Sequence, residues 1–150
     1  MTLDLLLFFI SLGLMAAVVI LRRPVVLLSL VTVAQWYLGA ELQSVYEVAG
    51  SSTLISALIS FGFHLSLPAV GLLLFKRQYQ RTTALGFLLI VVWAITYSAL
   101  SLELLQPAIQ LSNGFFYGLI LDNQLQILGA LVVLSFMASN GVRAPKRNKK

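Results

Sequence analysis

Residues 3–25 read LDLLLFFISLGLMAAVVILRRPV, and this stretch decides the fold class. The run Leu3–Leu21 has the length of about 20 mostly apolar residues that a helix needs to cross about 30 Å of hydrocarbon. An acid, Asp4, stands near its start, and a basic turn follows its end: Arg22, Arg23 and Pro24. Proline is tolerated in the first turn of a helix, where its missing N–H has no partner in any case. The stretch therefore predicts a transmembrane helix, a basic turn and the start of a second helix.

The same pattern recurs along the whole chain. Further apolar runs predict four more spans, at about 25–42, 52–75, 82–105 and 121–138. With 59% hydrophobic and 10% charged residues, a chain of 150 residues cannot hide its apolar surface in a soluble core. We therefore expect an all-α integral membrane protein with five transmembrane helices in residues 1–139 and a basic tail at 140–150. Residues 41–52 are expected to form an outer loop, and 106–118 a loop or an interfacial helix.

Charge placement predicts the orientation of this bundle. The ten cations follow three of the apolar runs: Arg22, Arg23, Lys76, Arg77, Arg81, Arg143, Lys146, Arg147, Lys149 and Lys150. The five acids stand at the opposite ends of the runs: Asp4, Glu41, Glu47, Glu103 and Asp122. The positive-inside rule then places the amino terminus outside and the carboxyl terminus inside. Topology accounts for the net charge of +5, so we expect lipid as a partner and no nucleic acid.

The third predicted helix carries a polar series at i, i+4 spacing, which places its members on one face: Ser52, Ser56, Ser60 and His64. A histidine inside a membrane is costly enough to suggest a proton relay, a haem ligand or a quinone contact. Haem is the weaker option, because bis-histidine ligation needs a second His and the chain has one. The alternative is that small Ser residues allow close helix packing and that His64 is hydrogen-bonded to a neighbour.

Glu41 and Glu47 complete the candidates for a proton path. A carboxylate drawn slightly inward from the outer boundary can exchange protons near neutral pH, whereas one in a hydrated loop has no such role. Gln35 and Tyr97 add polar atoms that must find partners in lipid. The sequence holds no Cys and no phosphate-binding, zinc or nucleophile motif. We therefore expect no metal or cofactor bound by this chain and no catalysis by the chain alone.

Two stretches, Leu7–Leu14 and Val19–Val25, resemble the start of the chain-6 (J-type) membrane subunit of respiratory NADH:quinone oxidoreductase, complex I. That family typically has an apolar helix that ends in an Arg-Asn-Pro-Val turn. Arg23 matches its Arg, and the Asn is absent here. The closing region resembles the family more loosely, through Phe116-Tyr117, Gln124-Leu125 and Gly129 to Val133.

The third helix of that family opens with an acid, for which Glu47 is the better match and Glu41 the alternative. It also carries a Tyr-x-Gly-Ala stretch, whereas residues 56–60 here read SALIS and contain no Tyr.

The resemblance implies a subunit without a redox centre in the membrane arm of a proton-translocating complex. NADH and quinone would then react on partner subunits, other integral membrane chains would surround this one, and the membrane would be the mitochondrial or bacterial inner membrane. Three alternatives stay open: a scaffold or assembly subunit, a small oligomeric transporter or channel, and a holin-type lysis protein.

Overall fold

The computed structural model describes residues 2–21, 24–48, 53–74, 84–106, 112 and 114–141. These residues form helices almost throughout and contain no strand, apart from one bridge between Thr2 and Ser112. The helices are α1 (Leu3–Leu21), α2 (Val25–Val48), α3 (Thr53–Leu74), α4 (Ala84–Leu105), α5 (Phe115–Asp122) and α6 (Gln124–Gly141). The all-α class that the sequence predicts is confirmed for this part of the chain.

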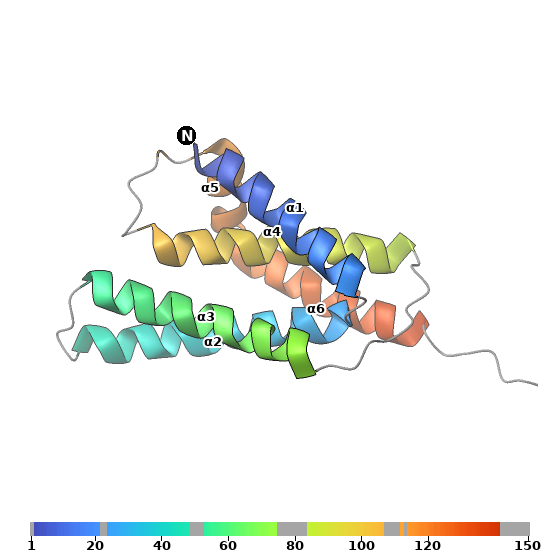
Figure 1. Ribbon diagram of the computed structural model, residues 1–150, viewed down its shortest axis with the longest axis horizontal. Helices are drawn as coiled ribbons and strands as arrows, with labels where there is room; N and C mark the ends of the chain where they lie inside the picture. The colour runs from blue at the N-terminus through green and yellow to red at the C-terminus, as the bar shows by residue number, and fades with distance from the viewer. Residues whose placement is uncertain are drawn as a thin grey trace, which may run out of the picture.

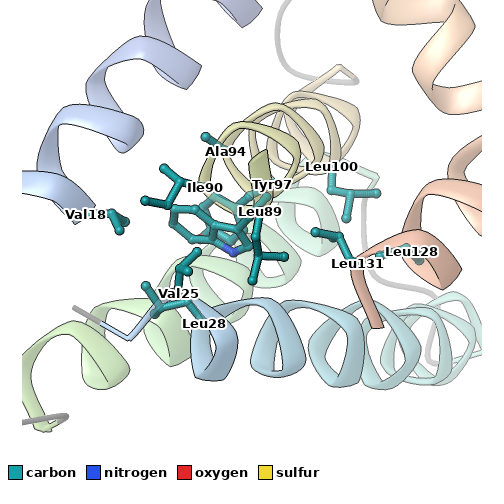
Figure 2. Packing of buried hydrophobic residues seen from close by; sticks show 11 residues of the cluster. Val18, Val25, Leu28, Leu89, Ile90, Ala94, Tyr97, Leu100, Leu128 and Leu131 are labelled. Atoms are coloured by element: carbon teal, nitrogen blue, oxygen red, sulfur yellow. The ribbon is translucent and has the colours of Figure 1, made fainter. Parts of the chain in front are cut away.

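Helix α4 is the centre of the bundle, and every other helix packs against it. Its middle is buried on all sides, because it is apolar around its whole circumference and is interrupted by small residues such as Ala94, Ser98 and Ala99. Small side chains let neighbouring backbones approach closely. Helices α2 and α3 lie side by side, and α1 crosses α4 obliquely (Figure 1). Figure 2 shows the core around Tyr97, to which α1, α2, α4 and α6 contribute side chains.

The helix ends gather at the two ends of the bundle (Figure 1). The carboxyl ends of α1, α3 and α6 lie at one end, whereas the amino ends of α1 and α3 lie at the other, with α5. The three basic clusters directly follow α1, α3 and α6 in sequence, but their residues, Arg22 and Arg23 included, lie outside the described part. The sidedness of the chain stays a prediction.

By length and composition, α1 and α4 are apolar enough to cross a membrane, and the pair α5 and α6 makes a third candidate if it counts as one bent span. The continuous apolar parts of α2 and α3 are shorter, at Val25–Gly39 and Leu58–Val70. The prediction that α2 stops near residue 42 before an outer loop is wrong, because α2 continues to Val48. The reason lies in the segment Ala40–Gln43, whose residues are all strong helix formers.

The helix of the span predicted at about 121–138 begins slightly later in the structure. Helix α5 ends at Asp122, and α6 begins at Gln124 with a bend of 73° between them. Asn123 makes the break, with φ −114° and ψ 20°. Its Nδ2 donates to the carbonyl of Leu119 at 2.8 Å. The Asn123 side chain thus provides a hydrogen-bond donor for a carbonyl in the last turn of α5. From Phe115 onward, the segment expected to be a loop or a helix is helical.

Candidate functional site

The site begins with Pro68, which lies inside α3. A proline has no N–H, so the carbonyl of His64, four residues earlier, has no donor from its own helix. Two side chains from neighbouring helices donate to this oxygen: Gln35 Nε2 of α2 at 2.6 Å and Tyr97 OH of α4 at 2.9 Å. Gln35 Nε2 also donates to the carbonyl of Phe63 at 2.7 Å. The interruption in α3 thus becomes the point at which three helices are joined by hydrogen bonds.

Three aromatic rings form a stack beside this carbonyl. The imidazole of His64 lies on the ring of Tyr97 with centroids 4.6 Å apart and planes 13° apart. Trp93 stacks with Tyr97, with centroids 5.6 Å apart and an interplanar angle of 18°. Trp93 and Tyr97 are four residues apart and therefore share one face of α4. The stack fixes the plane of the His64 ring through contacts with an entirely different helix.

A second hydrogen-bond chain links this stack to α2. Trp93 Nε1 donates to Thr32 Oγ1 at 2.9 Å, and Thr32 Oγ1 donates to the carbonyl of Leu28 at 2.9 Å. We call the five buried residues of this region the polar cluster: Thr32, Gln35, His64, Trp93 and Tyr97. Two of its side-chain atoms, Gln35 Oε1 and His64 Nε2, have no hydrogen-bond partner among the described residues.

Apolar side chains surround the polar cluster. Figure 2 shows Tyr97 among Leu89, Ile90 and Ala94 of its own helix, with Leu131 of α6 and Leu28 of α2 nearby. Gln35, His64 and Tyr97 lie near the middle of α2, α3 and α4, respectively. The arrangement is therefore a small polar layer enclosed in an apolar bundle, about halfway along it.

The structure places only part of the predicted polar series. Ser60 and His64 are buried on α3, and His64 belongs to the polar cluster. Ser52 lies outside the described residues, as does the side chain of Ser56. Helix α2 contains the backbone of Glu41 and Glu47, but their side chains also lie outside the described part. The contacts of His64 shown by the structure are thus with α2 and α4.

Pro24 has the position that the sequence predicts for it, immediately before α2. Its carbonyl accepts the N–H groups of Leu27 at 3.1 Å and Leu28 at 3.2 Å, which is the hydrogen bonding of a first helical turn.

Thr32 and Trp93 are the members of the polar cluster that the sequence analysis missed. Pro68 in the sequence could have predicted that other helices donate to the His64 carbonyl. A proline within a span leaves the carbonyl four residues earlier without a helical donor. Gln35 and Tyr97 were expected to find partners, and the structure shows which they are. Nothing in the sequence identifies Thr32 as the acceptor for Trp93, since 61 positions separate the two residues.

A second polar contact joins the start of α1 to the start of α5. Asp4 Oδ1 accepts the N–H of Tyr117 at 2.8 Å, and Asp4 Oδ2 accepts the N–H of Phe116 at 3.4 Å. The residue preceding α5 is Gly114, which has no side chain to cap the helix. Asp4 therefore acts as the cap from another helix, where its negative charge also suits the helix dipole. A Cβ on Gly114 would overlap the Asp4 carboxylate, so only glycine leaves room for this contact.

No protein-family model, curated protein or solved structure matches this chain. Among the described residues, no group of three His, Asp or Glu side chains is placed to hold a metal ion. His64 is the one imidazole in the chain, and neutral polar groups surround it in the polar cluster.

Proposed function

We propose that this chain is a five-span membrane subunit without a redox centre, in the membrane arm of a proton-translocating NADH:quinone oxidoreductase. The observation that carries the proposal is the polar cluster, which places a titratable imidazole about halfway along an apolar helix bundle. Ionisable groups in such a position are typical of proton paths. The choice of complex I among proton-translocating complexes rests on the resemblance of the first helix and its basic turn to the chain-6 subunit.

The outer surface of the bundle supports placement in a membrane. Large apolar side chains stand out from α1 and α5, including Ile20 and Phe115, each 75% exposed. Exposed apolar side chains also lie on α6, such as Phe136 and Met137. A soluble monomer rarely exposes so much apolar surface to water. Lipid hydrocarbon chains or neighbouring membrane subunits would cover this surface and remove the free-energy cost of its contact with water.

The helix lengths support five crossings. At 1.5 Å per residue, α2 is about 36 Å long and α3 about 33 Å, and both exceed the hydrocarbon thickness of about 30 Å. The polar carboxyl-terminal part of α2, after Gly39, then lies in the headgroup region. In the proposed topology the amino terminus is outside, the carboxyl tail is inside, and α5 lies at the outer surface before α6 crosses.

In this role the chain provides part of a proton path, and electron transfer takes place on partner subunits. NADH and quinone bind to partner subunits, and His64 exchanges protons with ordered water between those subunits and the proton-translocating ones. The membrane is the mitochondrial or the bacterial inner membrane.

A scaffold subunit is the second candidate, and the stacking of His64 on Tyr97 favours it. In a scaffold these contacts only fix the packing of three helices, and the imidazole takes no part in proton transfer. Single replacement of His64 would then leave pumping per electron unchanged, and the complex would be lost only when the packing volume changes.

A native gel of the solubilised membrane tests the proposal. The chain is tagged at its tail and extracted in a mild detergent, the gel is stained for NADH oxidation, and the band is analysed by mass spectrometry. We expect co-migration with a large NADH-oxidising assembly. Migration as a small oligomer, together with ion flux through liposomes that hold the purified chain alone, would instead support a transporter or channel.

A further inference from the structure

Gln35 and His64 each keep one buried polar atom without a partner among the described residues. The residues are 1% and 4% exposed, so bulk solvent does not reach them. The Gln35 amide nitrogen is fully used, since it donates to the carbonyls of Phe63 and His64. Its oxygen Oε1 is the unpaired atom, and the other is Nε2 of the His64 ring. The Gln35 amide thus already contacts the backbone of the residue whose ring bears the second atom.

The chemistry of these two atoms defines what can bind them. An amide oxygen only accepts hydrogen bonds, so the ligand must be a donor. Imidazole Nε2 either donates or accepts, depending on which tautomer is present, and a water molecule can serve either tautomer while it donates to the amide oxygen. An anion without protons fails the first requirement. A metal cation would find only two ligands here, fewer than metal sites in proteins provide.

We propose that Gln35 and His64 bind one internal water molecule between α2 and α3. The water donates one proton to Gln35 Oε1 and either donates to or accepts from His64 Nε2. Internal waters typically make about three hydrogen bonds to buried groups that otherwise lack partners. This inference rests on the proposed placement in a membrane, where no bulk water is present to satisfy the two atoms.

The water gives Gln35 a second task. Its amide nitrogen holds the interrupted turn of α3, and its oxygen positions the water at the imidazole. Gln35 is therefore a positioning residue for proton exchange at His64.

The single histidine makes this proposal directly measurable. Growth with ¹⁵N- and ¹³C-labelled histidine marks only His64, because the chain has no other. The protein is reconstituted in lipid nanodiscs, and magnetisation transfer from water to the imidazole is recorded by NMR. We expect a water cross-peak at His64 in the wild type and its loss in Gln35→Leu. The absence of the cross-peak in the wild type overturns the proposal, even if the variant does not fold.

The Tyr97→Phe variant is the matched control. The Tyr97 hydroxyl also lies beside His64, and its exchangeable proton is another possible source of transfer. Tyr97→Phe removes that hydroxyl and leaves both Gln35 Oε1 and His64 Nε2 in place. The cross-peak is expected to persist, and its loss in this variant would assign the signal to the phenol and overturn the water site.

A parallel extraction separates this inference from the proposed function. Chain that remains in the membrane after alkaline washing but shows no water cross-peak contradicts only the water site. Chain released by the wash contradicts the membrane placement and the water site together.

Discussion

Pro68 leaves the carbonyl of His64 without a helical donor, and that carbonyl accepts hydrogen bonds from α2 and α4 instead. A proline that would otherwise weaken α3 thus fixes the position of α3 relative to two neighbours. Because the donors are the side chains of Gln35 and Tyr97, the arrangement depends on the register of all three helices. This dependence makes the contact testable by substitution.

Gln35→Leu is expected to destabilise the bundle by about 2 kcal/mol, because it removes the Nε2 donor shared by the buried carbonyl of His64 and the carbonyl of Phe63. In a Pro68→Ala background the loss is expected to fall by about 1 kcal/mol, since the new N–H of residue 68 serves the His64 carbonyl. Reversible unfolding in mixed detergent micelles measures all four members of this double-mutant cycle. Additive effects would contradict the proposed link between the proline and the glutamine.

Two substitutions at Tyr97 separate its hydroxyl from its ring. Tyr97→Phe removes one donor to the His64 carbonyl and is expected to cost about 1 kcal/mol. Tyr97→Leu also removes the stacking with His64 and Trp93, so we expect a loss larger by about 1 kcal/mol or more. The same unfolding measurement checks both variants. Equal losses would show that the stacked rings add nothing to stability.

Asp4→Ala is expected to loosen the start of α5, because it removes the acceptor for the N–H groups of Phe116 and Tyr117. Loss of a helix cap typically costs about 1 kcal/mol. Hydrogen exchange at these two amides is expected to become faster. Asp122→Ala, at the opposite end of the same helix, is the control and should leave their exchange unchanged.

Gly114→Ala is expected to have the same effect as Asp4→Ala, because the added Cβ occupies the space of the Asp4 carboxylate. Once Asp4 is replaced by Ala, the Gly114 substitution should have little further effect. Exchange rates of Phe116 and Tyr117 in the double variant measure this. A full additional effect in the double variant would mean that the glycine is needed for another reason.

Single cysteines report the topology cleanly, because the natural chain has no cysteine. Thr2→Cys and Ser112→Cys are expected to react with a membrane-impermeant maleimide from the outside, whereas Lys150→Cys should react only after the membrane is opened. Thr2 and Ser112 must agree with each other, since a backbone bridge joins them. Labelling of Lys150→Cys in sealed cells or vesicles of known orientation would reverse or reject the proposed orientation.

His64→Leu is expected to lower the number of protons pumped per electron while the complex still assembles. Ser66→Ala is the matched control, because Ser66 is exposed on the same helix and donates only to the nearby carbonyl of Phe63. Acidification of the lumen of inverted vesicles, normalised to NADH oxidation, is measured for both variants. Normal pumping by His64→Leu in an assembled complex would favour the scaffold role.

The residues of the polar cluster show what sequence reasoning finds and what it does not. His64 is conspicuous because it is an ionisable group in an apolar run, and Gln35 and Tyr97 because their polar atoms require partners in lipid. The choice of partners is not visible, since it depends on how α2, α3 and α4 are rotated about their axes. The i, i+4 series names a face of α3, but the face alone does not say which neighbouring helix it meets.

The sequence by itself determined the helical class and the limits of α1 and α4, because long apolar runs that end at charged or proline-containing turns leave few other structures. Only the tertiary structure decided that α2 continues to Val48, that the chain bends at Asn123, and that Asp4 caps α5. The physical reason is the separation in sequence over which each interaction acts. Hydrophobicity and helix propensity act over neighbouring residues, whereas the donors for an interrupted turn or an uncapped helix come from segments far away in the chain.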